Sequence, residues 1–188
     1  MEIIKHILER KECYLPLVKL FPDGKYENIG HGRNTPEFIT IHEVSLGTKK
    51  TPAEKDAQHY IDLLDHPKGD PRCAYHFLCT GEEIYQFLPT WARTAHTGST
   101  MGNSSIGIER LVNVNVDFDK AILDQAKLTA SLMHMYNIPL TNVVPHKYWS
   151  GKECPARLLA GMYGWNWEKF LITVKDFYAN KDFFYDIL

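Results

Sequence analysis

The segment 38–42 constrains the fold most, because it reads Phe-Ile-Thr-Ile-His and is rich in β-branched residues. A short apolar run of this kind predicts a buried strand. A helix is expected to follow, since Thr51 can cap it, Pro52 suits its first position and Glu54 completes a capping box. Apolar residues then recur at helical spacing, at Ala53, Ala57, Tyr60, Ile61 and Leu64.

The alternation of strands and helices continues along the chain. Thr-Gly-Glu-Glu at 80–83 separates two apolar runs and predicts a hairpin turn, and 92–104 predicts a long loop rich in Gly, Ser and Thr. The other predicted elements are strands at 74–79, 84–88 and 105–112, a helix at 119–136 that stops before Pro139, and a helix at 166–178. This order predicts an α/β fold, in which a mixed β-sheet lies mostly at the centre and is flanked by helices.

The length and the charge limit the domain organisation and the partners. The 188 residues fit a single domain over 1–188, since one hydrophobic core usually serves ~100–200 residues. The net charge of −2 provides no basic field for nucleic acid or anionic lipid. No stretch approaches the ~20 apolar residues of a membrane span. We therefore expect neither nucleic acid nor a membrane as a partner.

The cysteines and the N-terminus indicate the compartment. The first residues lack the pattern of a secretory signal peptide, although a processed chain would not show one. Cys13, Cys73, Cys79 and Cys154 are irregularly spaced, without a CxxC motif. They are interpreted as free thiols of a reducing compartment, except where one binds metal. Synthesis in the cytoplasm without a signal peptide is expected.

The segment 145–155 is the richest in groups that bind metals. Histidine and cysteinate are good zinc ligands, and His146 and Cys154 lie eight residues apart. On a straight strand this separation would be ~26 Å, so the chain must fold back, and a Ser-Gly pair supplies the turn. Pro155 is predicted to open a short helix with Cys154 at its cap, a position that lowers the pKa of a thiol.

The same segment also has an interpretation without a metal. His146 can pack against Trp149, and Cys154 can be a small buried hydrophobe, since the spacing is not that of a zinc finger. A third ligand must come from elsewhere, and His42 ends the apolar strand. A lone histidine there is more often simply hydrogen-bonded, but strand ends are where α/β proteins assemble sites from distant segments.

Five motifs occur in a fixed order along the chain. They are Ile-Thr-Ile-His at 39–42, Ala-Tyr-His-Phe at 74–77, Ala-His-Thr-Gly at 95–98, Asn-Ser-Ser-Ile-Gly-Ile-Glu at 103–109, and His146 with Trp-Ser-Gly-Lys-Glu-Cys-Pro at 149–155. Each motif is weak alone, but their joint order and spacing are specific. From about Phe38 to Leu159 the chain resembles the N-acetylmuramoyl-L-alanine amidase family, which includes phage endolysins and bacterial autolysins and is related to peptidoglycan recognition proteins.

The resemblance implies the amidase and peptidoglycan-recognition-protein fold and a zinc-dependent reaction. His42, His146 and Cys154 would hold Zn²⁺, with a water in the open fourth position of a catalytic site. The metal would polarise the scissile carbonyl and activate the water, whose pKa falls to roughly 7 on zinc. The implied reaction is hydrolysis of the amide bond between N-acetylmuramic acid and L-alanine in bacterial peptidoglycan, by an endolysin or an autolysin.

The resemblance also implies the catalytic residues. Lys152 matches the family's catalytic lysine and can stabilise the oxyanion, although a solvated surface lysine is the usual default. Glu109 matches a glutamate that acts as a general base in several endolysin-like members. Tyr75 matches the tyrosine assigned in other members, and we favour Glu109 as the base with Tyr75 as hydrogen-bonding support. Glu109 can instead pair with Arg110 or Lys152 as a purely structural residue.

Four residues are candidates for lining a groove that contacts the substrate, namely Trp91, His96, Thr97 and Asn103. Trp91 can equally belong to the core, and His96 can be an ordinary loop histidine. His76 alternates with Tyr75 along a strand, so it is expected to face the other way as a core or supporting histidine. Glu43 departs from the small polar residue of many relatives. It is expected to point opposite to His42 and to have no direct metal role.

Other functions fit parts of the same pattern. Some proteins of the resembled fold bind peptidoglycan without cutting it, but they usually lack a metal ligand, above all the cysteine that is present here as Cys154. A zinc peptidase would cut within the stem peptide, but the HExxH helix signature is absent. A glycosidase with paired carboxylates is a third, weaker alternative.

The ends of the chain carry no motif of the family. Residues 1–37 are an N-terminal extension without a match, and 160–188 are expected to hold a C-terminal helix. A C-terminal wall-binding module, which endolysins of this type often carry, would lie outside this chain. Peptidoglycan is the expected substrate, reached after release from the cytoplasm.

Overall fold

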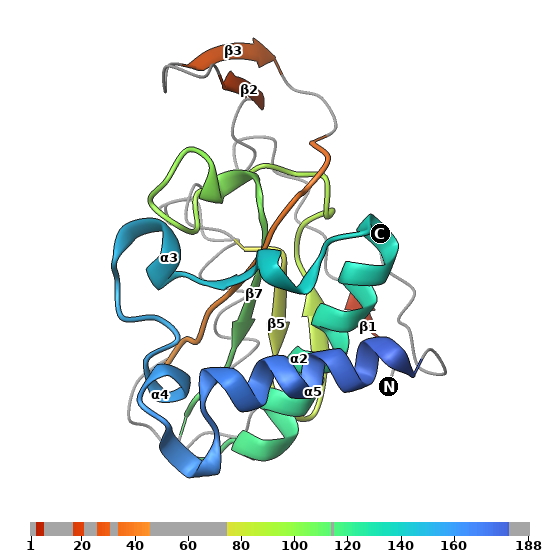
Figure 1. Cartoon of the computed structure of the whole chain (residues 1–188), viewed down its shortest axis with the longest axis vertical. Helices are drawn as coiled ribbons and strands as arrows, with labels where there is room; N and C mark the ends of the chain where they lie inside the picture. The colour runs from red at the N-terminus through yellow and green to blue at the C-terminus, as the bar shows by residue number, and fades with distance from the viewer. Residues whose placement is uncertain are drawn as a thin grey trace.

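The main sheet has six strands in the order β1-β6-β5-β7-β4-β8 (Figure 1). The computed structural model describes residues 3–5, 17–20, 26–30, 34–45, 75–113 and 115–180. The six strands are β1 (Ile3–Lys5), β4 (Ile39–Ile41), β5 (Phe77–Cys79), β6 (Ile84–Gln86), β7 (Ile106–Arg110) and β8 (Val143–Pro145). A separate antiparallel pair consists of β2 (Leu17–Leu20) and β3 (Tyr26–Gly30).

The sheet is mixed, as the sequence predicts. Only β5 and β6 pair antiparallel, and the other neighbouring strands of this sheet are parallel. In the predicted hairpin, the amide of Thr80 donates to the carbonyl of Glu83 at 3.0 Å. Gly81 turns the chain at a φ of +86°, where a Cβ would lie 3.0 Å from the carbonyl oxygen of Asp117. The N-terminal segment contributes β1 at the sheet edge, where Ile3 joins the core.

Two long helices lie side by side over one face of the sheet (Figure 1). Helix α2 spans Phe118–Tyr136, with the side chain of Asp117 accepting from the amide of Lys120, and it ends at Asn137 in a left-handed conformation. Helix α5 spans Trp167–Ala179, capped by Asn166. Both agree with the predicted helices to within one residue. The helix predicted after Thr51 lies outside the described residues. The part of the chain that the structure describes also contains five shorter helices, namely η2 (Gly102–Ser104), η3 (Leu140–Asn142), α3 (Lys147–Ser150), α4 (Ala156–Leu159) and η4 (Met162–Gly164).

The two faces of the sheet have different roles. Alternate side chains of the strands pack against α2 and α5 and form the main core, which includes Ile39, Ile41, Phe77, Cys79, Ile106, Ile108, Ile122, Ala126, Phe170 and Val174. The residues between them point to the opposite face. Thr40 and His42 are buried there, so β4 is enclosed on both sides. This second face carries the candidate site.

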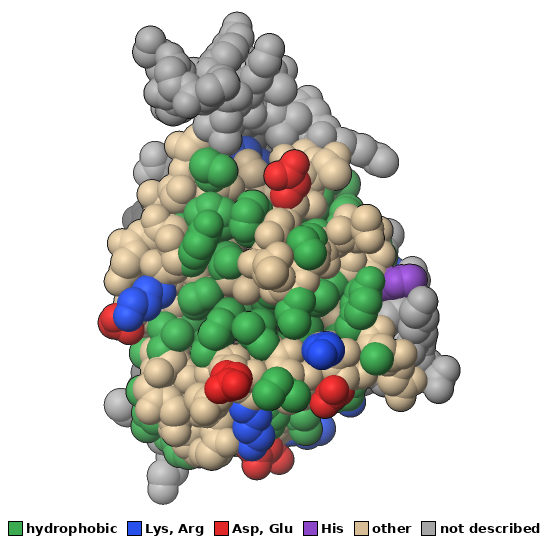
Figure 2. Space-filling view, in the orientation of Figure 1, with side chains coloured by type: hydrophobic (Ala, Val, Ile, Leu, Met, Phe, Trp, Pro, Cys, Tyr) green, Lys and Arg blue, Asp and Glu red, His purple; other side chains and the backbone are tan. Residues whose placement is uncertain are grey.

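The face of the molecule that Figure 2 shows carries charges of both signs. In the view of Figure 2, Lys and Arg side chains alternate with Asp and Glu side chains around hydrophobic and polar ones. Among the helices that the structure describes, none combines the length and the apolar character that crossing a bilayer requires.

A buried ion-pair network joins the sheet to α2 and α4. Arg110 is fully buried, and its guanidinium donates to Glu43 Oε2 at 2.8 Å and to Gln125 Oε1 at 3.3 Å. Glu43 Oε1 in turn accepts from the amide of Arg157 at 2.9 Å and from its guanidinium at 3.2 Å. Glu43 therefore points away from His42, as expected. The carboxylate that pairs with Arg110 is that of Glu43, and not that of Glu109.

We predict that Glu43→Ala lowers the free energy of unfolding by about 3 kcal/mol, because it leaves the Arg110 charge buried without a carboxylate. Urea titration measures this loss. A matched control is Glu153→Ala, which removes the ion pair of Lys147 with Glu153, whose side chains are 48% and 66% exposed. An exposed pair of this kind contributes less than ~1 kcal/mol. Equal losses in the two variants would contradict the prediction.

Candidate metal centre

Two histidines leave the sheet at the same edge. Strands β4 and β8 are parallel, with Ile41 opposite Pro145, so the next residues, His42 and His146, emerge side by side. Their ring centroids are 4.7 Å apart. Ile41 is also opposite Ile108 of β7, which brings Glu109 to the other side of His42. Parallel pairing thus places three chemically active side chains on one face.

The chain folds back after His146 and returns Cys154 to the same place. Helix α3 ends at Gly151, whose φ of +75° suits glycine, and the amide of Lys147 donates to the carbonyl of Cys154 at 3.1 Å. The thiol sulfur lies 3.9 Å from His42 Nδ1. Ligand atoms of His42, His146 and Cys154 all lie within 4.8 Å of one another. The predicted turn is therefore present, and the three residues converge.

The predicted helix cap at Cys154 is wrong. Pro155 occupies the N-cap position and α4 begins at Ala156, so the thiol lies outside the helix. Burial, followed by the carboxylate of Glu109, raises the pKa of Cys154 to about 12. A helix of one turn has too small a dipole to overcome these two effects. A metal ion is what would convert this buried thiol to a thiolate.

Both histidines present a ring nitrogen to the shared space. His146 Nε2 lies 3.0 Å from the carbonyl oxygen of Thr97, so Nε2 carries the proton and Nδ1 carries the lone pair. His42 uses Nε2 in a 2.9 Å contact with His96, which leaves its Nδ1 facing Cys154. Burial is the main cause that lowers the pKa of His42 and of His146, and neutral imidazole is the form that binds metal.

The donor set fits a metal ion. His146 Nδ1 and Glu109 Oε2 are buried, and neither has a hydrogen-bond partner among the described residues. Buried polar atoms without partners are costly, so a ligand in this space would remove a real penalty. Two imidazole nitrogens and one sulfur match the three-ligand zinc sites that keep one position open.

Glu109 and Lys152 border the same space. Glu109 Oε1 lies 3.9 Å from His42 Nδ1, and the carboxylate is 13% exposed. Burial raises the pKa of Glu109 to about 8, while the positive charge of Lys152 acts in the opposite direction. Lys152 is itself exposed, and its charge also acts on His42, His146 and Cys154. The donors therefore have a carboxylate 3.9 Å from His42, and the positive charge of Lys152 acts on all three of them.

The side chains of Tyr75 and His76 lie in different environments. Tyr75 is buried against the ring of Phe87, at a centroid distance of 5.8 Å, in a second hydrophobic cluster. His76 is buried as well, and Nδ1 accepts from the amide of Gly107 while Nε2 donates to the carbonyl of Ala92. Both ring nitrogens are used inside the protein, so His76 is a supporting residue and not a member of the donor set, as expected.

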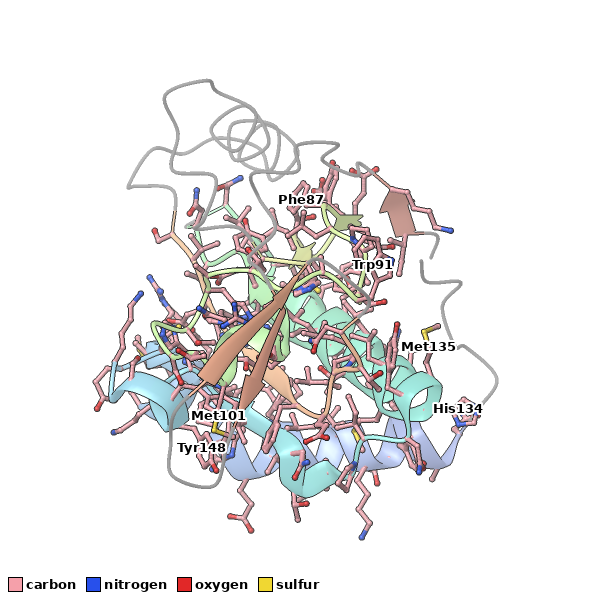
Figure 3. The ribbon with its side chains drawn as sticks, turned by 90° about the horizontal axis from the view of Figure 1, so that it is seen from above. Phe87, Trp91, Met101, His134, Met135 and Tyr148 are labelled. Atoms are coloured by element: carbon pink, nitrogen blue, oxygen red, sulfur yellow. The ribbon has the colours of Figure 1, made fainter. Side chains whose placement is uncertain are left out.

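The four candidates for substrate contact lie in or beside the loop 92–105. Asn103 Oδ1 accepts from the amides of His96 and Thr97 and from the hydroxyl of Thr97, so this side chain holds the loop in shape. Trp91 is half-buried and packs on the second hydrophobic cluster, near Phe87 (Figure 3). Substrate contact by these residues stays a prediction.

Sequence reasoning missed Gln125. Its side-chain amide donates to the carbonyl oxygens of His42 and Ile108, both at 3.0 Å, and so ties α2 to the strands that carry the site. The available signal was a long polar side chain on the apolar face of the helix, next to Ala126. A buried amide in that position needs partners.

Comparison with known proteins gives close relatives. The N-acetylmuramoyl-L-alanine amidase XlyA of Bacillus subtilis (strain 168) is 43% identical over 128 residues, which are 66% of this chain and 41% of XlyA. The N-acetylmuramoyl-L-alanine amidase CwlH of the same strain is 38% identical over 140 residues, which are 72% of this chain and 52% of CwlH. The chain thus spans about half the length, or less, of these relatives.

Similarity of the fold and a match to a family profile point to the same group of proteins. The structure of the catalytic domain of XlyA matches with a TM-score of 0.71 at 32% identity, covering 93% of this chain and 99% of that one. A sequence profile of N-acetylmuramoyl-L-alanine amidases matches residues 32–157, which contain the three converging donors and Glu109. On the profile, the relatives and the shared fold together, this chain belongs to the N-acetylmuramoyl-L-alanine amidase family.

Proposed function

We propose that this chain hydrolyses the amide bond between N-acetylmuramic acid and L-alanine in peptidoglycan, with one Zn²⁺ held by His42, His146 and Cys154. The convergence of these three donors on one buried space carries the proposal. Family membership supports the choice of bond. The chain would act on the bacterial wall after release, as a phage or prophage endolysin or as an autolysin.

The residues around the donors have complementary roles. Bound zinc would polarise the scissile carbonyl and lower the pKa of a water molecule toward 7. The charge of a bound zinc ion would lower the pKa of Glu109 from about 8, and the ionised carboxylate could then accept a proton from the attacking water. The ammonium group of Lys152 stabilises negative charge that develops on the carbonyl oxygen. Tyr75 would supply hydrogen-bonding support, and it replaces Glu109 as the candidate base if Glu109 proves dispensable.

The first test is metal content measured together with the products from purified peptidoglycan. We expect one zinc per chain, new L-alanine amino termini and intact sugars. Affinity for zinc should fall in acid, because binding needs neutral histidines and a deprotonated cysteine. A peptidase would instead release termini from within the stem peptide, and full activity without metal would exclude the proposed mechanism.

Cys154→Ser should lose zinc or most of the activity, because a hydroxyl is a poor substitute for a thiolate ligand. Cys79→Ser is the matched control, since Cys79 is also a free, fully buried thiol but lies in the core face of β5. The control should keep its zinc. Metal content and lysis rate of the two folded variants decide the matter, and equal metal loss in both would count against Cys154 as a specific ligand.

Glu109→Gln should keep zinc and the fold while turnover falls by roughly 10²–10⁴, the range for a lost general base. The amide has nearly the same shape but cannot take up the proton. Glu153→Gln is the control, because this glutamate is exposed and pairs with Lys147. Turnover, zinc content and thermal stability are measured together. Near-full turnover of Glu109→Gln with zinc bound would move the role of base to Tyr75.

Lys152→Ala should lower turnover by roughly 10²–10³ while wall binding survives, because the cation acts mainly on charge in the transition state. Lys147→Ala tests the loss of a nearby exposed lysine that pairs with Glu153. The split between kcat and KM is the informative measurement. If Lys152→Ala raises KM alone, or loses zinc, then Lys152 has a binding or structural role.

A further inference from the structure

His96 lies between a candidate metal ligand and a backbone carbonyl. Its Nδ1 is 2.9 Å from His42 Nε2, and its Nε2 is 3.1 Å from the carbonyl oxygen of Ser105. The ring therefore uses both nitrogens inside the protein. It lies one residue before Thr97, whose carbonyl holds His146.

The carbonyl sets the direction of the whole chain of hydrogen bonds. Because the oxygen of Ser105 can only accept, His96 Nε2 must carry a proton. The neutral ring then has its lone pair on Nδ1, which accepts from the Nε2 proton of His42. The reverse direction would require a doubly protonated His96, which would place a positive charge against the rings of His42 and His76, at centroid distances of 5.1 and 6.0 Å, and next to the proposed metal ion. His42 is left with its lone pair on Nδ1, which faces Cys154 and Glu109.

The fold makes room for this ring. A Cβ at Gly107 of β7 would lie 2.7 Å from His96 Nδ1, so only glycine allows the imidazole to lie against the strand. The backbone amide of His96 is held by Asn103 at 3.2 Å. The hydroxyl of Ser105 contacts Thr40 and the carbonyl of Gly102, which fixes the segment that carries the accepting oxygen.

We propose that His96 is a positioning residue for the metal site: it fixes the Nε2-protonated tautomer and the ring orientation of His42, so that Nδ1 is presented to the ion. This inference rests on the proposed zinc site. Partners of this kind commonly change metal affinity by roughly 10–100-fold when they are removed. The loop 92–105 would then orient both histidine donors, His42 through His96 and His146 through Thr97.

The test compares two substitutions at position 96. In His96→Asn the side-chain oxygen stands near the position of Nδ1 and can still accept from His42. In His96→Leu the volume is similar but the acceptor is gone. We expect zinc affinity, measured by competition with a chelator, to fall by roughly 10–100-fold in His96→Leu and to be largely restored in His96→Asn. His134→Leu is the control, since His134 is an exposed histidine of α2 whose ring contacts Tyr178 of α5 (Figure 3).

Nitrogen-15 NMR of the metal-free protein reads the tautomers directly. We expect wild-type His42 and His96 each to carry the proton on Nε2, and His42 in folded His96→Leu to become a mixture of tautomers. A proton on His42 Nδ1 in the wild type would overturn the inference, as would equal zinc affinity of folded His96→Leu and the wild type. If the wild-type chain binds no zinc, the proposed function fails, and the NMR result still decides whether His96 sets the tautomer of His42.

Discussion

The parallel pairing of β4 with β7 on one side and β8 on the other is the constraint on which the site depends. Parallel strands bring residues from distant parts of the chain to one edge in register. Here the register places His42 between Glu109 and His146, all one residue beyond paired positions of the sheet. A shift of one residue in any of the three strands would turn its side chain into the core.

The opposite face of the same strands holds this register in place. Ile39 and Ile41 of β4 and Ile106 and Ile108 of β7 pack with α2 and α5 in the main core. Polar contacts also hold these strands. The side-chain amide of Gln125 in α2 donates to the carbonyl of His42, and the ion pair of Arg110 with Glu43 connects β7 to the chain around Arg157. The backbone of the site is therefore anchored by a helix and by a buried ion pair.

The space between the donors is held in a state that favours binding of a cation. Burial lowers the pKa of His42 and of His146 and so favours their neutral forms, and His146 Nδ1 and Glu109 Oε2 have no partners among the described residues. Burying such atoms costs free energy unless a partner satisfies them. Sites of this kind accept a local cost in stability because the same unsatisfied groups supply affinity and reactivity when the ligand arrives.

The sequence alone determined the local elements and the identity of the chemical groups. The β-branched run at 38–42, the turn at 80–83 and the capped helices α2 and α5 follow from neighbouring residues, since strand pattern, turn chemistry and capping are local properties. The ordered motifs also pointed to His42, His146 and Cys154. Only the tertiary structure decided how these groups behave. Burial beside Glu109 raises the pKa of Cys154 against the prediction from its place near a helix, and the position of Ser105 sets the proton on His96. Burial and hydrogen-bond direction depend on segments far apart in the chain, and so no pattern of neighbouring residues contains them.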